Sequence, residues 1–211
     1  QHTQEEIDKI LCKNFDSFQK YGEGFSNLKR SATYNTFNKI KKRLGKMGYM
    51  ADDKLTKKGE FSSKIYADEI LTGEMFATDF YRKLNEFQIL MIIACLCYES
   101  RKRTEFYKVY RSAFIDDLKK ELRYNHYLQK EKRFNELETL TALIHPCYHG
   151  KNIFEIIRNT NLLEGDVIRF FRQVLDRIGQ IKNATDDYVL RRLLDNCKSI
   201  INDSMKDIEI L

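Results

Sequence analysis

The stretch EGDVIRFFRQVLDRIGQIKNA, residues Glu164–Ala184, separates into an apolar and a polar face when it is wound as an α-helix at about 100° per residue. The polar face carries Arg, Gln and Asp, whereas the other predicted helices carry mainly Lys and Glu. Neither Lys nor Glu occurs from Gly165 to Ile181. This choice of side chains raises the question of what the face contacts. The apolar residues are Val167, Ile168, Phe170, Phe171, Val174, Leu175, Ile178 and Ile181, and the polar residues are Arg169, Arg172, Gln173, Asp176, Arg177 and Gln180.

The charge balance of the whole chain permits nucleic-acid binding without requiring it. The 211 residues include 37 Lys and Arg against 31 Asp and Glu, which gives a formal net charge of +6. A chain of this length can bury a substantial core, in one domain or in two small ones. Nine glycines and a single proline, Pro146, leave long uninterrupted helices as the default.

The cysteines and the apolar segments indicate a reduced, cytoplasmic protein with no membrane span. The five cysteines are odd in number and lack the spacing of a disulfide framework. The most apolar run, FQILMIIACLCY at Phe87–Tyr98, is shorter than the ~20 residues that a bilayer requires, and it predicts a buried core helix. Residues 1–20 are polar and periodic, unlike a signal peptide. Because the chain opens on Gln1 and not on Met, we expect a piece of a longer protein.

Residues 1–74 follow the order of a winged-helix unit, which is a helix, a basic helix, a short β-hairpin and a further helix. The capping pattern TQEE at Thr3 begins the first helix. The second helix is predicted from Thr33 to Gly45, with Phe37, Ile40 and Leu44 facing inward. An Asp52-Asp53 turn between two short arms predicts a hairpin near Tyr49–Leu55. Thr56 is expected to cap one further helix, which carries Phe61, Ile65, Ile70 and Leu71.

The same unit contains a basic stretch with two interpretations. From Lys29 to Lys58 the sequence has ten basic residues, opposed only by Asp52 and Asp53. A winged helix can present such residues to a phosphate backbone, where cations add salt-dependent affinity without sequence choice. The alternative is a solvated helix face, or a surface docked on another domain. The candidate phosphate-binding residues are Lys39, Lys42 and Arg43.

Residues 75–211 show helical periodicity throughout and predict an all-α bundle, so the fold class is mainly α. One long amphipathic helix is expected from Ser100 to Tyr127, with Phe106, Val109, Tyr110, Phe114 and Leu118 on one stripe. Asp186 or Asp187 is expected to favour the start of the last helix through the helix dipole. The other helices are predicted at Asn85–Glu99, Leu137–Tyr148, Ile153–Ile157, Glu164–Ala184 and Asp187–Asp207.

The sequence lacks the motifs of the common catalytic and metal sites. It contains neither a phosphate-binding G-x-x-x-x-G-K-[ST] loop nor a G-x-G-x-x-G turn, and neither H-E-x-x-H nor paired C-x-x-C. His145, Cys147 and His149 lie two apart in HPCYHG, but Pro146 interrupts them and no fourth ligand is nearby. We therefore predict no catalytic residue and no metal site, with this segment being the end of a helix.

Four stretches resemble a known family. LTKKGEFSSKIYADEIL, Leu55–Leu71, resembles the segment that leaves the winged helix in the DExH-type superfamily II RNA helicases related to the exosome and antiviral helicases. FQILMIIACLCYESRK looks like the first core helix of their helical C-terminal domain, called DSHCT. HGKNIFEII and then LLEGDVIRFFRQVLDRIGQIKNA, the most specific part, continue that domain in order. The family usually has a Trp shortly before the Gly matched by Gly150, where this chain has Cys147, Tyr148 and His149.

The resemblance implies a role for the opening stretch. In that family a single strand passes through a ring of two RecA-like ATPase domains, the winged helix and the helical domain, and one long "ratchet" helix faces the strand. Glu164–Ala184 corresponds to this helix, and the strand-facing pair falls on Gln173 and Asp176. Arg and Gln offer planar donors to phosphate, ribose hydroxyl or base edges without demanding one sequence. The same face adds Arg169, Arg172, Arg177 and Gln180 as candidate nucleic-acid-binding residues.

The resemblance also implies partners and cofactors. The chain would be the C-terminal nucleic-acid-guiding module of an ATP-dependent RNA helicase, with a winged-helix domain at 1–74 and a DSHCT bundle at 75–211. ATP and Mg would bind in RecA-like domains of the parent, so this chain alone is expected to hydrolyse no ATP. The partners implied are single-stranded RNA, with DNA as an alternative, the RecA-like domains and the RNA-decay machinery. We expect a monomer.

Two rival functions remain open at the level of sequence. A free-standing winged-helix regulator would dimerise and prefer particular duplex sites. A protein-interaction scaffold would bind no nucleic acid. The helicase module would bind single strands without sequence preference.

Overall fold

A computed structural model describes residues 33–101 and 103–208, and the chain divides into two compact units, residues 1–56 and 57–211. The described part is mainly α-helical, with one antiparallel pair of two-residue strands, as predicted. None of its helices is long and apolar enough to cross a membrane. The domain division predicted at residue 74 stays a prediction.

The first unit contains a helix at residues 33–46 and the predicted hairpin. Strand β1 (Met50–Ala51) pairs with β2 (Lys54–Leu55), so that Met50 lies opposite Leu55. Asp52 and Asp53 have φ values of 48° and 63°. Positive φ at both central residues is the geometry of a two-residue type I′ turn, and Asp tolerates it better than most residues. The Asp-Asp turn therefore sets the hairpin where the sequence predicts it.

The predicted inward face of the 33–46 helix is wrong in part. Phe37 and Ile40 are 59% and 54% exposed. The hairpin follows Gly48, whose positive φ ends the helix, and it lies against the second half of the helix, where Asp53 pairs with Lys41 and Tyr49 N–H bonds the Leu44 carbonyl. Nothing among the described residues covers the earlier turns. The helix predicted from Thr3 lies outside the described residues, and the winged-helix assignment stays a prediction.

The second unit begins with two helices where one was predicted. Helix α3 (Lys57–Ser63) and helix α4 (Glu69–Phe76) are separated by a loop at residues 64–68. Asp68, which precedes α4, has a φ of 58°, in the left-handed region that interrupts a right-handed helix. A short 3-10 helix, η1 (Asp79–Lys83), follows α4.

Helix α5 (Glu86–Cys97) is the core of the second unit, as its unbroken apolar run predicts. It begins with a capping box formed by Asn85 and Gln88, and ten of its twelve residues are buried. A helix that is apolar on all sides has to be covered on all sides. Helices α7 (Leu137–Tyr148), α9 (Glu164–Ala184) and α10 (Tyr188–Met205) pack against it.

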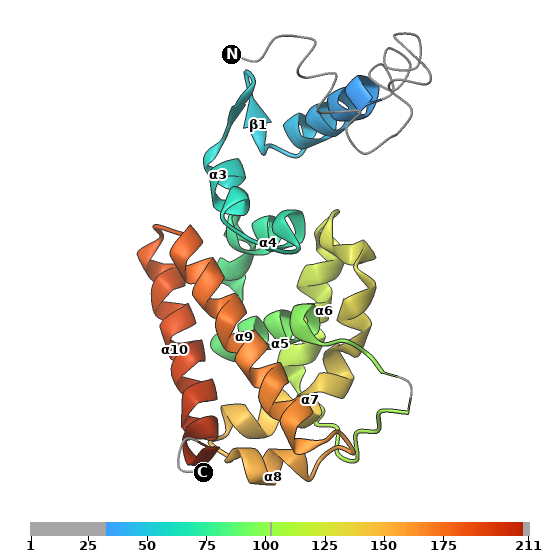
Figure 1. The fold of residues 1–211 in the computed structure, drawn as a ribbon, viewed down its shortest axis with the longest axis vertical. Coiled ribbons are helices and arrows are strands. Elements are labelled where there is room, and N and C mark those ends of the chain that lie inside the picture. The colour runs from blue at the N-terminus through green and yellow to red at the C-terminus, as the bar shows by residue number, and fades with distance from the viewer. Residues whose placement is uncertain (1–32, 102, 209–211) are drawn as a thin grey trace, which may run out of the picture. The chain divides into compact units, whose positions relative to one another are not determined.

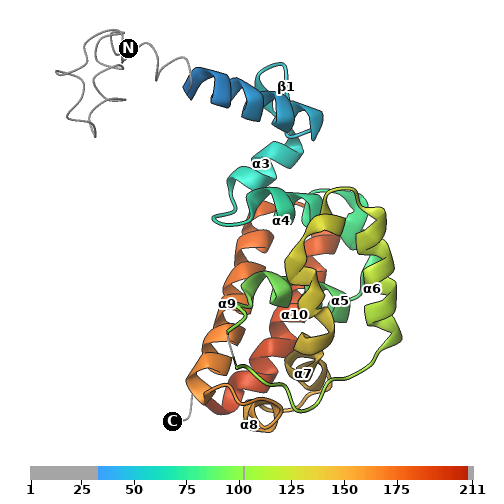
Figure 2. The same ribbon diagram turned by 90° about the vertical axis from the view of Figure 1, so that its right-hand side faces the viewer.

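Helices α9 and α10 lie side by side in both views of the ribbon (Figure 1, Figure 2). Three residues at 185–187 reverse the chain between them, and the Asp187 carboxylate caps α10 by accepting from the N–H groups of Val189 and Leu190. The apolar face of α9 is buried as predicted, with Phe171, Val174 and Ile178 fully covered. Its polar face is left toward solvent.

The prediction of one helix from Ser100 to Tyr127 is wrong over its first half. Helix α6 covers only Ala113–Tyr124, and Ser112 caps it. Residues 103–112 form an extended strap, in which Tyr107 N–H bonds the Asn159 carbonyl at 2.8 Å and Phe106 pairs with Thr160. These long-range bonds replace the local helical bonds. The remaining elements are η2 (Leu128–Lys130), η3 (Lys132–Glu136), α8 (Ile153–Ile157) and η4 (Lys206–Ile208).

Candidate nucleic-acid interface

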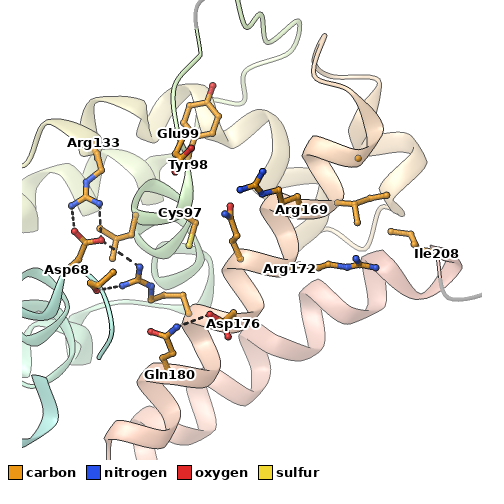
Figure 3. A pocket seen from close by; sticks show the side chains of 16 residues that line it. Asp68, Cys97, Tyr98, Glu99, Arg133, Arg169, Arg172, Asp176, Gln180 and Ile208 are labelled. Carbon is orange, nitrogen blue, oxygen red and sulfur yellow. Dashed lines mark hydrogen bonds and ion pairs between the residues drawn. The ribbon is translucent and has the colours of Figure 1, made fainter. Parts of the chain in front are cut away.

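The polar face of α9 forms one wall of a groove in the second unit, of about 1080 Å³ (Figure 3). We call it the α9 groove. All six polar residues that the sequence predicts on this helix line it. The facing wall comes from the end of α5, from the loop before α4 and from η3. The lining residues outside the predicted six are Ala67, Asp68, Leu96, Cys97, Tyr98, Glu99, Arg133, Gly165, Ile168 and Ile208.

Three side chains of the α9 wall are free to bind a ligand. Arg169 and Arg172 are exposed and Gln173 is half-buried. In the described part of the chain none of the three side chains has a hydrogen bond or an ion pair. Figure 3 shows the Arg169 guanidinium pointing into the groove toward the end of α5, while Arg172 extends on the side of Ile208. The groove therefore offers donors along its length.

Asp176 is bonded to its neighbour one turn later. Gln180 Nε2 donates to Asp176 Oδ2 at 2.7 Å, as the dashed line in Figure 3 marks. The other carboxylate oxygen, Oδ1, has no partner among the described residues. Gln180 Oε1 is buried and also lacks a hydrogen bond there. The pair therefore fixes the carboxylate and leaves one acceptor of Asp176 open.

Arg177 is held by a cluster that the sequence did not predict, which we call the Asp68 brace. The Asp68 carboxylate accepts two bonds from Arg133, at 2.8 and 3.0 Å, and lies 3.6 Å from Arg177 Nη2. Arg177 Nη1 also donates to the Ala67 carbonyl. The bond from Arg133, outweighing the effect of burial, lowers the pKa of Asp68. The brace joins the 64–68 loop, η3 and α9.

The charges in the groove leave a local positive excess on the α9 side. Its lining includes four arginines (133, 169, 172 and 177) against Asp68, Glu99 and Asp176. Asp68, together with Glu131, which accepts from Arg133 Nε at 3.0 Å, balances Arg133 and Arg177. Arg169 and Arg172 have no acidic partner among the described residues. Burial raises the pKa of the Cys97 thiol to about 11 and also raises that of the Tyr98 phenol. Both groups are therefore neutral at pH 7 and do not repel an anionic ligand.

A comparison with protein families matches residues 52–208 with the DSHCT (NUC185) domain. The chain belongs to the DSHCT family. This domain is a C-terminal module of helicases, and the matched range contains all of α9 and the whole lining of the groove. The family thus identifies the chain as a C-terminal helicase module, while the geometry identifies the α9 groove as its candidate binding surface.

One curated relative of this DSHCT chain is the "mRNA transport homolog 4" of Caenorhabditis elegans. The two are 22% identical over 200 residues, a match that covers 86% of this chain and 20% of the relative. The chain thus spans about a fifth of the length of that relative.

The basic residues predicted in the first unit do not belong to the α9 groove. Lys39, Lys42 and Arg43 are exposed on the 33–46 helix. Lys42 borders a small hollow beside the hairpin, together with Lys41, which forms an ion pair with Asp53 at 2.7 Å. Their role in nucleic-acid binding stays a prediction.

The HPCYHG segment of the DSHCT domain is the end of α7. His145 stacks on Tyr110 with a centroid distance of 4.3 Å, and burial and the nearby His149 lower its pKa. Cys147 is buried, which raises its pKa to about 12. Among the described residues no group of three or more His, Cys, Asp or Glu side chains could hold a metal ion.

Asp68, Tyr98 and Arg133 are groove residues that sequence analysis missed. They come from a loop, a helix end and a 3-10 helix, which have no periodicity to mark a face. The one local signal is the acidic residue before α4, a position typical of helix starts, and it points to capping and not to a groove.

Proposed function

We propose that this chain is the C-terminal nucleic-acid-guiding module of an ATP-dependent, DExH-type RNA helicase related to the exosome and antiviral helicases. The observation that supports this most directly is the α9 groove, in which Arg169, Arg172 and Gln173 line one wall and have no partner among the described residues. Side chains of this kind bind a flexible anionic strand through phosphate, ribose and base edges without selecting a sequence. The membership of the DSHCT family supports the same function.

In this proposal the groove holds single-stranded RNA while the motor domains move it. Arg169 and Arg172 pair with phosphates, and Gln173 donates to sugar or base. The open Oδ1 of Asp176 accepts a hydrogen bond from a ribose hydroxyl, while Gln180 keeps the carboxylate oriented. Arg177 acts differently from the other arginines because Asp68 already balances its charge, so it positions the helix.

The other domains of the proposed helicase belong to the parent protein. RecA-like domains there supply the ATP and Mg site, and this chain alone hydrolyses no ATP. The parent works in the cytoplasm as a monomer and passes RNA to the decay machinery. The name of the relative, "mRNA transport homolog 4", is in keeping with an RNA substrate.

A binding measurement separates the proposal from its rivals. Fluorescence anisotropy with labelled single-stranded and duplex RNA should show salt-dependent binding of the single strand without sequence preference. The Gln173→Ala/Asp176→Ala variant should bind at least several-fold more weakly. Arg191→Ala/Arg192→Ala, on an exposed part of α10 outside the groove, is the control and should change little.

The rivals give different results. A preference for one duplex site together with dimerisation would favour the winged-helix regulator. Absence of binding to any nucleic acid would favour the interaction scaffold and would overturn the proposal.

A further inference from the structure

Tyr98 is an aromatic side chain fixed on the wall of the α9 groove that faces α9. It is the residue that ends α5, and its N–H bonds the Ala94 carbonyl at 2.9 Å. Its ring packs edge-to-face against Phe106 and Phe170, with interplanar angles of 66° and 86° and centroid distances of 6.0 and 6.3 Å. The ring is therefore held in place by packing while it remains partly exposed.

The ring borders the same space as the free donors of α9. Tyr98, Arg169 and Gln173 together line the α9 groove, and all three also line a smaller hollow that adjoins it. Figure 3 shows Tyr98 at the end of α5 and the Arg169 guanidinium pointing from α9 toward that end. The groove is thus lined here by an aromatic ring from the end of α5 and by a planar cation from α9.

We propose that Tyr98 is a nucleobase-stacking residue, with Arg169 on the facing side of the bound base. The proposal rests on the function proposed above, that the groove holds single-stranded RNA. Stacking of bases on aromatic side chains is sequence-tolerant, because every base has a π-face, and Arg adds to it through cation–π attraction. A ring that packing already holds loses little freedom when a base stacks on it.

Other exposed tyrosines do not share this position. Tyr66 and Tyr188 are 87% and 75% exposed, but neither lines the groove. The Tyr98 phenol is neutral at pH 7, and burial raises its pKa above the ordinary value, so the ring does not repel the phosphates beside the base. Position and rigidity together single out Tyr98.

The test compares an RNA with bases to one without them. Anisotropy is measured for oligoadenylate RNA and for an abasic ribose-phosphate oligomer of the same length and label. Tyr98→Leu should weaken oligoadenylate binding about 5- to 30-fold, a loss typical of one stacked base, and should change abasic binding less than twofold. Tyr98→Phe should keep most of the affinity. Tyr188→Leu is the control and should change neither.

The outcomes distinguish this inference from the proposed function. Suppose that wild type binds both oligomers. If Tyr98→Leu leaves both affinities unchanged, or lowers both by the same factor, Tyr98 does not stack and the inference is wrong. If wild type binds neither oligomer, the proposed function itself fails. If Tyr98→Leu does not fold, the wild type still decides: oligoadenylate must bind at least about fivefold more tightly than the abasic oligomer. Equal affinities would overturn the stacking role.

Discussion

Arginines on one helix face have different roles in this chain. Arg177 is only 12% exposed at its side chain and is held by Asp68 and the Ala67 carbonyl. Arg169 and Arg172, about two turns and one turn earlier, are exposed and have no partner in the described part of the chain. The position on the helix decides this difference, because only the C-terminal half of α9 reaches the 64–68 loop. Arg169 and Arg172 are therefore available to bind a ligand, whereas Arg177 stabilises the fold.

Substitutions on the two faces of α9 should separate stability from binding. Phe171→Ala removes a fully buried ring and should cost on the order of 3–5 kcal/mol of the free energy of unfolding. Gln173→Ala/Asp176→Ala alters the polar face and should stay within about ±0.5 kcal/mol per site. Thermal melts of both variants measure this. In the full-length parent, the polar variant should slow RNA unwinding and retain ATP hydrolysis, and full unwinding activity would contradict the role of this face.

Asp68→Asn should lower stability at neutral pH. The substitution keeps a side chain that tolerates positive φ but removes the charge that pairs with Arg177 and that, together with Glu131, pairs with Arg133. Because the carboxylate is partly exposed, the expected loss is roughly 1–2 kcal/mol, or a few degrees in Tm. Asp79→Asn, at a 92% exposed carboxylate paired with Arg82, is the matched control and should cost less than about 0.5 kcal/mol.

The stability lost in Asp68→Asn should depend on pH. The pKa of Asp68 is lower in the folded chain than its usual 3.8, chiefly through the bond from Arg133, so near and below this pH the unfolded chain binds more protons. The contribution of the Asp68 carboxylate to the free energy of unfolding is complete above about pH 4 and is lost as the pH falls through the pKa of the folded state. The Tm difference between wild type and Asp68→Asn should therefore shrink below pH 4. A difference that stays constant down to pH 2.5 would show that charge is not the cause.

At the scale of elements, the start of α10 depends on one carboxylate. Asp187 caps the helix and also accepts from Tyr81 Oη and Arg82 Nη2, both at 2.6 Å. Burial and this bond raise the pKa of Tyr81 to about 12, so the phenol donates at neutral pH. Asp187→Ala removes the cap and leaves the buried Tyr81 hydroxyl without its acceptor, which should cost roughly 2 kcal/mol. Chemical denaturation measures this loss. Asp186→Ala, at the exposed neighbouring residue, should be nearly neutral, and an equal loss in both variants would contradict the capping role.

Elements whose hydrogen bonds join residues close in sequence could be predicted from the sequence. Elements that are held by residues far away in the sequence could not. Helices α7, α8 and α9 have the predicted bounds, because periodicity and caps act within a few residues. The strap at 103–112 has a helical apolar pattern, but Phe106 and Tyr107 bond to residues more than fifty positions later. The polar wall of the groove on α9 is therefore predictable from periodicity, whereas the facing wall is not, because the tertiary fold brings it there.

At the scale of the whole molecule, a small net charge of +6 does not determine where an anion binds. Exposed cations screened by salt act over about 10 Å, so the local arrangement decides. Many Lys and Arg side chains have an acidic partner, as Lys83 has in Glu121 and Lys151 has in Glu155. Arg169 and Arg172 line a groove and have no acidic partner in the part of the chain that the structure describes. They are therefore better candidates for phosphate contact than the overall surplus of charge.

The salt dependence of RNA binding tests this distinction. Each phosphate neutralised on a single strand contributes about 0.7 to the slope of log Kd against log salt. Arg169→Ala/Arg172→Ala should lower that slope by roughly 0.7 to 1.4, according to whether one or both pair with phosphate. Arg191→Ala/Arg192→Ala removes the same two charges from an exposed part of α10, so its slope should stay close to that of wild type. Anisotropy titrations between low and moderate salt measure both slopes on matched preparations. Equal decreases in the two variants would mean that net charge alone drives binding, since direct phosphate contacts are expected in the groove and not at this exposed part of α10.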